Sequence, residues 1–288
     1  MDARLQLRVQ RYGWDAAAPH YHTGWEAQLR PAHDQLLQMA RLERGQRVIE
    51  TACGSGLVTL RLALEVGENG AVLATDLSQG MIDDLQTRLV GQAITNVQAK
   101  RMSAEKLDIS DGSFDAAICA LGLMYTPDPA TAVAEMARAV VTGGTVAATV
   151  WGERRNCGWA EVFPIVDAHV ASEVCPMFFG TGSPGALLRD FEGAGLEQVE
   201  EQRHFETLVF RSDEEVIDAV LLGGPVALAV SGGPDSMQLM HMAAAQKGAA
   251  SVHVLSVDHQ LRDGSAVEAA FVEKEAHNLG LEHTTLRW

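Results

Sequence analysis

The sequence predicts an α/β protein built mainly on a doubly wound, mostly parallel sheet, with a shorter α/β segment after it. Up to Val150, short apolar runs of strand length alternate with stretches of helical period. Such alternation is typical of parallel strands joined by crossover helices. The same pattern restarts near residue 225, and 288 residues are enough for one large domain plus part of a second.

Each element of the first part follows from its own pattern. Apolar spacing and strand propensity predict, in order, a helix at 29–42, a strand at 47–52, a helix at 57–64, a strand at 71–78, a helix at 81–89, strands at 96–102 and 114–123, a helix at 133–140 and a strand at 144–152. Residues 153–183 then interrupt this rhythm with an aromatic-rich, partly helical insertion.

The second part continues the alternation. The patterns predict a helix at 184–196, a strand at 197–210, a helix capped by Ser212 and reaching about residue 222, and then strands at 225–231, 251–259 and 282–288 with helices at 234–247 and 265–279. We therefore expect one domain at residues 1–223 and a truncated segment at 224–288.

Composition excludes several classes of function. The net charge of −16 argues against broad capture of nucleic acid, which needs clustered Lys and Arg. The 4 cysteines are widely spaced, so neither a zinc site nor a disulfide framework is indicated. Neither a signal peptide nor an apolar run long enough to insert into a membrane is found, so we expect a cytoplasmic protein.

A glycine-rich turn follows the first predicted strand, in the stretch VIETACGSGLVTL at residues 48–60. Thr59 stands where a dinucleotide-binding pattern needs its third glycine, and Glu50 would repel a pyrophosphate. An acid at that place suits a cationic group, such as the ammonium of a methionine moiety. Asp76 ends the next strand, where a carboxylate can accept both hydroxyls of a ribose. The pattern indicates S-adenosylmethionine (SAM).

Four motifs in order carry a family resemblance. The stretches VIETACGSG, VLATDLSQGM, MSAEKLDISDGSFDAAICALGLMYTPDP and AVVTGGTVAATVWG resemble class I SAM-dependent methyltransferases, in the branch similar to ubiquinone/menaquinone-biosynthesis C-methyltransferases. The resemblance implies a Rossmann-like sheet, SAM as the cofactor and a small-molecule methyl acceptor. The aromatic residues of the insertion at 153–183 favour an apolar or aromatic acceptor, although core packing explains them about equally well. The resemblance also implies a set of cofactor-binding residues: Glu50, Ala52, Gly54 and Gly56 for the methionine end, Asp76 for the ribose, Met81, Ser103, Ala104 and Glu105 around the adenine, and Cys119, Ala120 and Leu121 along the methionyl group.

Two positions depart from the family pattern. Ala52 replaces its first motif glycine, and Ser103 replaces the acid that commonly accepts the adenine amino group. No single catalytic base stands out, because a sulfonium is already an activated methyl donor. Tyr21, Tyr125 and His169 are the candidates, and packing explains each of them equally well. A non-catalytic nucleotide-binding module therefore remains an alternative.

A second glycine turn lies at residues 226–237, VALAVSGGPDSM. Together with the stretch to Trp288 it resembles the N-terminal part of tRNA(Ile)-lysidine synthase, a PP-loop ATP-pyrophosphatase. The resemblance implies contacts to the pyrophosphate of ATP from Ser231, Gly232, Gly233, Asp235 and Ser236, with Asp258 and His259 near the nucleotide.

The second resemblance covers only part of the PP-loop family's pattern, because its later motifs do not follow. We expect no lysidine synthesis, although a bifunctional fusion with an ATP-dependent, lysidine synthase-like activity remains an alternative. We also expect strand 251–257 to dock on the edge of the first sheet, because an uncovered edge invites aggregation.

Overall fold

The computed structural model describes residues 3–157, 160, 179–212, 215, 228–229, 240–241, 253–258 and 265–287. Its main sheet is parallel throughout and has the strand order β3-β2-β1-β4-β5. The strands are β1 (Arg47–Thr51), β2 (Ala71–Asp76), β3 (Val97–Arg101), β4 (Phe114–Ala120) and β5 (Val140–Thr149). The predicted doubly wound sheet is confirmed. Its strand order reverses between β1 and β4, which is where open α/β sheets bind ligands.

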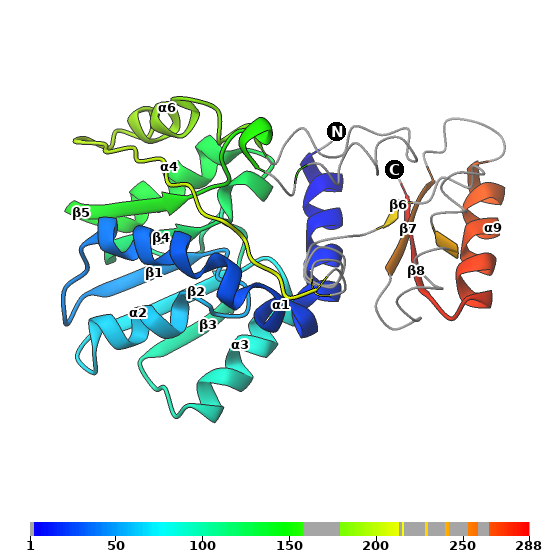
Figure 1. Ribbon diagram of the computed structural model, residues 1–288, viewed down its shortest axis with the longest axis horizontal. Helices are drawn as coiled ribbons and strands as arrows, with labels where there is room; N and C mark the ends of the chain where they lie inside the picture. The colour runs from blue at the N-terminus through cyan, green and yellow to red at the C-terminus, as the bar shows by residue number, and fades with distance from the viewer. Residues whose placement is uncertain are drawn as a thin grey trace.

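Helices cover both faces of this sheet (Figure 1). The helices are α1 (Ala3–Ala40), α2 (Thr59–Val66), α3 (Gln79–Gly91), α4 (Pro129–Ala139) and α6 (Ala186–Gly193), and the 3₁₀ turns are η1 (Leu123–Tyr125) and η2 (Arg154–Asn156). The end of α1 packs with α2 on Val48, Val72 and Ile118. On the other face, α4 and α6 pack on Ile49 and Ala117. Neighbouring residues of β1 thus enter opposite cores, as the two-residue strand period requires.

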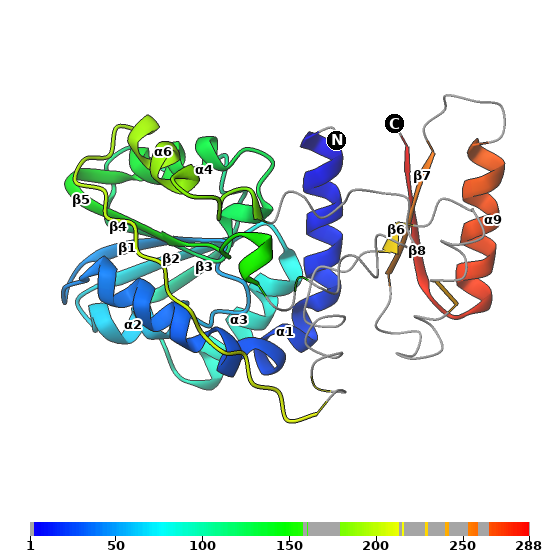
Figure 2. The same cartoon turned by 45° about the horizontal axis from the view of Figure 1, so that its top comes forward.

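The first helix is longer than the sequence predicts. α1 covers 38 residues and contains Pro19 and Pro31, whereas the apolar spacing predicts a helix only at 29–42. Proline in a helix interior removes one backbone hydrogen bond, so the pattern alone argues against this continuation. Figure 2 shows the N-terminal half of α1 extending past the C-terminal ends of the strands. It can therefore roof whatever binds there.

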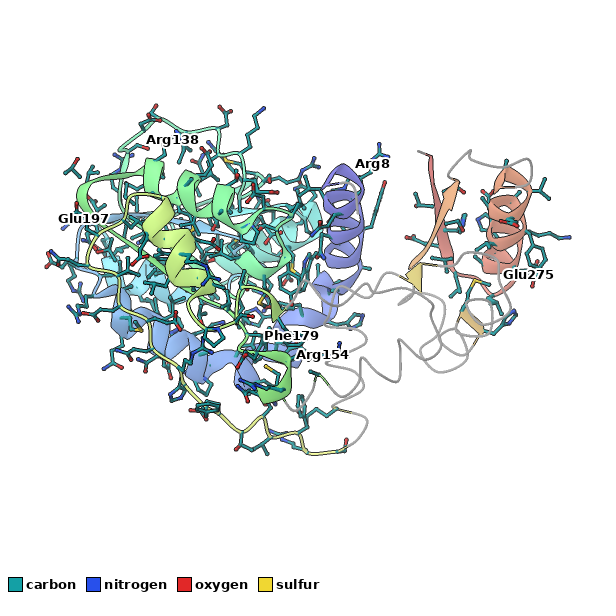
Figure 3. All side chains as sticks on the ribbon, turned by 90° about the horizontal axis from the view of Figure 1, so that it is seen from above. Arg8, Arg138, Arg154, Phe179, Glu197 and Glu275 are labelled. Atoms are coloured by element: carbon teal, nitrogen blue, oxygen red, sulfur yellow. The ribbon has the colours of Figure 1, made fainter. Side chains whose placement is uncertain are left out.

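The loop that follows β3 is fixed to α4 by one side chain. Arg138 donates to the carbonyls of Leu107 and Ile109 at 3.0 Å each and to both oxygens of Glu135, and it also pairs with Asp111. Glu135 in turn accepts the N–H of Leu107 at 2.8 Å. Figure 3 shows Arg138 on this outer side of α4. The clamp holds residues 107–111 and, with them, the chain that leaves β3.

The stretch at 197–210 is not a strand, contrary to the sequence prediction. It runs as an extended segment along α1, where Gln28 Nε2 donates to the Val209 carbonyl at 2.8 Å and Gln35 Nε2 donates to Gln202 Oε1 at 2.7 Å. Phe205 and Val209 are largely exposed. A strand needs a partner strand for its backbone groups, and no described strand lies beside this segment.

The C-terminal segment forms a sheet of its own, which corrects the expectation that 251–257 docks on the first sheet. Strands β6 (Leu228–Ala229), β7 (His253–Asp258) and β8 (Glu282–Arg287) pair in parallel in the order β6-β7-β8. Helix α9 (Ser265–Asn278) packs on β7 and β8. Parallel pairing with β8 satisfies the backbone of β7 within the segment itself. In Figure 3, Glu275 of α9 and Arg138 of α4 lie on opposite sides of α1.

Most predicted elements are found within a few residues of their expected bounds, with one further difference at β5. This strand begins directly after α4 at Val140, and the Gly143–Gly144 pair lies inside it rather than before it. The register with β4 shifts there, and Gly143 has a φ of 82°. The glycines thus form an irregularity in the strand. The expected domain boundary at 223/224 lies outside the described residues and stays a prediction.

Candidate functional site

A pocket lies at the C-terminal ends of the main sheet, beside the point where the strand order reverses. The space between its walls measures about 650 Å³, counting the part that is open to solvent. Its walls come from α1, from the ends of β1, β2, β3 and β4, and from the start of α3: Leu7, Gln10, Trp14, Tyr21, Ala52, Gly54, Asp76, Leu77, Met81, Met102, Ser103, Ala104, Glu105, Ala120, Leu121, Gly122, Tyr125 and Thr126.

The glycine turn after β1 forms the floor. Gly56 has a φ of 91°, and a Cβ placed on it would lie 2.4 Å from Leu85 Cδ1, so a glycine lets α3 approach the turn. Ala52 keeps a left-handed φ of 52° although it is not a glycine. Leu121, at the end of β4, has a φ of 55°. Two non-glycine residues in this strained region line one pocket, as is common at binding sites.

Asp76 ties the turn to the second strand. Its Oδ2 accepts the N–H of Gly54 at 2.9 Å, and its Oδ1 accepts the N–H of Ser78 at 2.8 Å. Burial raises the pKa of Asp76 to about 6, and these two hydrogen bonds oppose that rise. The group is therefore mostly a carboxylate at pH 7 or above. Each oxygen keeps a lone pair, so the carboxylate can still accept two hydroxyl groups.

Glu50 lies below the turn and does not line the pocket. Its side chain is 1% exposed, and its Oε2 accepts the hydroxyl of Thr59 at 2.5 Å. Burial raises the pKa of Glu50 to about 8, although the bond from Thr59 lowers it. No cation pairs with Glu50 among the residues that the structure describes. Burial without a cation therefore favours the protonated form of Glu50, and a cation bound nearby would favour its ionised form.

Three aromatic rings roof the pocket. Trp14 meets Tyr21 and Tyr125 edge to face, with ring centroids 5.6 and 5.0 Å apart. The ring of Tyr21 lies against the turn, because its Cε1 would be 3.3 Å from a Cβ on Gly54. Burial raises the pKa of both phenols above the usual value, and the charges of Asp76 and Glu50 add to this rise at Tyr21. Both tyrosines therefore stay protonated at neutral pH.

Asp15 fastens the roof to the start of α3. Its Oδ1 accepts the hydroxyl of Ser78 at 2.6 Å and the N–H of Gly80 at 3.0 Å. Ser78 caps α3, since its Oγ accepts the N–H of Met81 at 3.0 Å. A carboxylate at a helix N-terminus is favoured by the free N–H groups there. Asp15 thus completes this N-terminus from another helix.

The wall after β3 carries the segment Met102 to Glu105. Ser103 Oγ accepts the N–H of Glu105 at 3.3 Å, and Glu105 Oε1 accepts the N–H of Asp128 at 2.9 Å. Glu105 Oε2 is shielded from solvent and has no hydrogen-bond partner. The same is true of Gln10 Oε1 on the roof. Two side chains of the lining thus carry acceptor atoms that are shielded from solvent and lack a donor.

The charged side chains in the described pocket lining are all acidic. Asp76 and Glu105 are acidic, and no Lys, Arg or His is found among the described residues of the lining. Phosphate-binding pockets supply basic side chains or N–H groups to anions. In this turn, the N–H of Gly54 is already used by Asp76. The pocket suits a cationic or neutral ligand better than a pyrophosphate. No group of three His, Cys, Asp or Glu suited to a metal ion occurs in the described part of the chain.

The structure brings most of the expected residues together. These line the pocket: Ala52, Gly54, Asp76, Met81, Ser103, Ala104, Glu105, Ala120 and Leu121, with Tyr21 and Tyr125. Glu50, Gly56 and Cys119 support it from below and do not line it. The remaining candidates lie outside the described residues: His169, Ser231, Gly232, Gly233, Asp235, Ser236 and His259. Asp258 ends β7, and its side chain is likewise not described.

Sequence reasoning missed part of the lining: Leu7, Gln10, Leu77, Met102, Gly122 and Thr126. Two signals could have found them. Leu77 and Met102 directly follow the ends of β2 and β3. Leu7 and Gln10 share a helical spacing with Trp14 and Tyr21, which places them on one face of a continuous helix. The proline at 19 hides that continuity in the sequence.

Comparisons with protein families agree with this geometry. The model described as a methyltransferase domain matches residues 48–144, which contain β1 to β4, the glycine turn and Asp76. A second model, described as a PP-loop domain, matches residues 211–288. No helix in the described part of the chain meets the length and apolarity that crossing a membrane requires.

Curated relatives match the same region. A demethylmenaquinone methyltransferase of Desulfitobacterium hafniense is 32% identical over 111 residues, which are 38% of this chain and 44% of the relative. The enzyme of the same name from Listeria monocytogenes is 27% identical over 129 residues, 45% of this chain and 54% of the relative. An uncharacterised protein of Mycobacterium tuberculosis is 33% identical over 127 residues, 44% of each chain. The chain spans about half the length of the curated relatives it matches.

Among solved structures, the cyclase SpnF aligns with a TM-score of 0.51 at 19% identity, over 86% of this chain and 76% of that chain. At this identity the likeness shows the fold alone, and the fold is the parallel α/β architecture described above. The family models, the relatives and the strand order agree with one another. Residues 48–144 therefore match the methyltransferase-domain family, and residues 211–288 match the PP-loop-domain family.

Proposed function

We propose that the protein binds SAM in the pocket and transfers its methyl group to a small apolar or aromatic acceptor. The observation that carries this proposal is the acidic pocket at the reversal of strand order, with Asp76 in its wall and Glu50 beneath its floor. SAM, when bound, supplies an activated methyl group on a sulfonium cation. The chain then has to hold the donor and the acceptor in line and to exclude water.

Each part of the pocket would take one part of the ligand. Asp76 would accept the ribose hydroxyls with the lone pairs that Gly54 and Ser78 leave free. A cationic methionine end above Glu50 would favour ionisation of this buried carboxyl, whose pKa is about 8 in the free protein, and the two opposite charges would then stabilise each other. The edge-to-face rings of Trp14, Tyr21 and Tyr125 offer π faces that favour a sulfonium or an aromatic acceptor.

We further propose that Tyr21 and Tyr125 position the acceptor and do not deprotonate it. A phenol with a raised pKa is a poor base at neutral pH but a good hydrogen-bond donor. Two of the relatives are demethylmenaquinone methyltransferases by name. A quinone-derived aromatic ring is therefore the first acceptor class to test.

The test is ligand binding by calorimetry with the full chain. SAM and S-adenosylhomocysteine should bind, and NAD should not. Asp76→Asn should weaken binding of S-adenosylhomocysteine about 10- to 100-fold, because charge-assisted hydrogen bonds are lost. Asp83→Asn is the matched control, since Asp83 lies on the exposed side of α3, where its carboxylate accepts a hydrogen bond from Gln79. Methyl transfer from labelled SAM to aromatic acceptors then tests the reaction.

Two results would overturn the proposal. One is binding of NAD with no binding of SAM. The other is an unchanged affinity of Asp76→Asn for S-adenosylhomocysteine. Binding of SAM without transfer to any acceptor would support the alternative of a non-catalytic nucleotide-binding module.

A second candidate function rests on the PP-loop match at residues 211–288. We propose that this unit binds ATP, as its resemblance to the start of tRNA(Ile)-lysidine synthase implies, and that a domain boundary lies at 223/224. The described part of the unit supports this with a parallel sheet and a covering helix. Titration of the full chain with ATP tests the proposal, and an ATP titration without heat or fluorescence change would contradict it.

A further inference from the structure

The segment at 197–210 has a strand-like backbone with no described strand beside it. From residue 199 to residue 210 it contains no turn or bend, and no residue in that stretch has a positive φ. The chain there is extended, so its side chains and its backbone groups both alternate in direction with a period of two. Figure 2 shows this segment on the outside of the molecule.

The two faces of the segment differ in burial. Leu208 and Phe210 are half-buried, and Phe210 packs on the apolar cluster around α1. On the other face Phe205 is 76% exposed and Val209 is 69% exposed, and Thr207 between them is exposed as well. The odd-numbered residues thus form an apolar stripe that no described part of the chain covers.

One backbone edge of the segment is used, and the other is open. Gln28 Nε2 donates to the Val209 carbonyl at 2.8 Å, so the odd-numbered residues point their backbone groups toward α1. The even-numbered residues point theirs the opposite way. No hydrogen bond from the described part of the chain reaches the backbone N–H or carbonyl of Glu206 or Leu208. These groups form an open edge like that of the outermost strand of a sheet.

We propose that this open edge binds the same edge of a second copy of the chain, in an antiparallel pair with its two-fold axis at Thr207. The sequence is self-complementary in this register. Phe205 of each copy lies opposite Val209 of the other, a favourable pairing of an aromatic with a β-branched residue, and the two Thr207 hydroxyls meet. Glu206 lies opposite Leu208, and these even-numbered residues form the hydrogen-bonded pairs, as the open edge requires.

Neighbouring registers are less favourable. An axis at Glu206 would set two carboxylates opposite each other, and an axis one residue beyond Thr207 would set Phe205 opposite Arg211. In the proposed register the only like charges directly opposite each other are at the ends, where Arg203 meets Arg211. Because both copies use the same edge, the pair closes at a dimer and does not extend further.

Sedimentation of the full chain over a wide range of concentrations tests the proposal. The mass should rise from that of one chain, 30.9 kDa, toward twice that value and no further. Phe205→Ser should weaken association at least about tenfold, because the dimer buries two phenylalanine side chains. Val90→Ser is the matched control, since Val90 is also an exposed apolar residue, at 82%, but belongs to α3.

Arg211→Glu should act in the opposite direction. It replaces the two like-charged pairs at the ends by pairs of opposite charge with Arg203. Association should therefore strengthen at least about threefold. A substitution that merely disturbed the fold would not tighten the dimer.

Cysteine substitutions test the register. Residues directly opposite each other in a non-hydrogen-bonded pair have Cα atoms about 4.5 Å apart, within the reach of a disulfide. Thr207→Cys should therefore form a disulfide-linked dimer in oxidised glutathione. Val209→Cys is the matched control, because the two copies of residue 209 would lie roughly 13 Å apart along the strands. Peptide mapping separates this link from any link through the 4 native cysteines.

The outcomes divide clearly. Association that Phe205→Ser weakens and Arg211→Glu strengthens, with a disulfide at position 207 and not at position 209, supports the inference. A monomer at every concentration, growth beyond the dimer, association that neither variant alters, or equal cross-linking at the two positions overturns it. None of these results depends on SAM, so this inference and the proposed function fail separately.

Discussion

At the scale of single residues, burial of two acids, Glu50 beneath the pocket floor and Asp76 in its wall, favours a bound proton or a cationic ligand. Glu50 is buried, bonded to Thr59 and unpaired with any cation in the described part of the chain, and Asp76 lies nearby. Their pKa values are raised to about 8 and about 6. The free protein therefore binds protons at these sites more tightly when folded than when unfolded.

This coupling makes stability depend on pH in a definite direction. A carboxyl group whose pKa is raised by folding contributes stability below its unfolded pKa, and that contribution is lost as the pH rises through the folded value. The free energy of unfolding should thus fall as the pH rises from about 4, with Asp76 contributing up to about pH 6 and Glu50 up to about pH 8. The slope approaches about 1.4 kcal/mol per pH unit for each such group. Urea unfolding of the ligand-free protein at several pH values measures it.

Replacing Glu50 by Gln removes the ionisable group and keeps its shape, so the loss of stability above pH 6 should become shallower. Glu43→Gln is the matched control, because Glu43 is exposed near the start of β1. Superimposable pH curves for the wild type and Glu50→Gln would show that Glu50 does not titrate in this range.

Some features of the candidate site can be predicted from the sequence residue by residue, and others cannot. The identities of Asp76, Gly54 and Glu105 follow from motif spacing, and all line the pocket. The strained backbone conformation of Ala52 and Leu121 cannot be predicted from motif spacing, because a left-handed φ at a non-glycine residue is imposed by the surrounding structure. The sequence also does not predict the unpartnered oxygen of Gln10, because its position depends on helix α1, and the apolar pattern does not extend that helix as far as residue 10.

At the scale of elements, α1 is the main departure from expectation. Pro19 and Pro31 argue against a long helix locally, but packing on α3 and on the main sheet outweighs the lost backbone bonds. The segment 197–210 shows the converse. Its composition favours a strand, yet without a partner strand it lies along α1 as an extended chain. Local pattern predicts elements well only where the tertiary partners are present.

The contact between α1 and α3 yields a prediction about ligand release. Asp15→Ala removes the acceptor for Ser78 and Gly80, so the N-terminal half of α1 loses its fastening over the pocket. Amides of residues 7–21 should exchange faster, because each lost hydrogen bond is worth about 1 kcal/mol. S-adenosylhomocysteine should dissociate about tenfold faster in stopped-flow displacement if both bonds are lost.

Asp34→Ala provides the control for this effect. Asp34 also fastens α1, through Arg61 of α2, but at a place that does not line the pocket. Its removal should leave the dissociation rate near that of the wild type. Equal dissociation rates for Asp15→Ala and the wild type would mean that α1 does not limit release.

At the scale of the whole molecule, the described residues form two sheets that share no strand. The sequence correctly predicts two α/β parts and their order. The prediction that a strand of the second part pairs with the first sheet is wrong. The expected docking of 251–257 assumed that the open edge of the first sheet governs its pairing. β7 pairs instead between β6 and β8, because neighbours in sequence close a sheet with short crossovers. Ligand binding at one sheet should thus leave the backbone pairing of the other unchanged.

Hydrogen exchange on the full chain, with and without S-adenosylhomocysteine, tests this independence. Protection should rise in the pocket segments 7–21, 52–56, 76–81, 102–105 and 120–126, because bound ligand adds hydrogen bonds and excludes water there. The strands and helix of the second unit, 253–258 and 265–287, should exchange at an unchanged rate. Since α1 contacts β7, protection spreading to 253–258 would reveal that the units are coupled and contradict the prediction. ATP should produce the complementary pattern, with protection within 225–259 and none in the pocket.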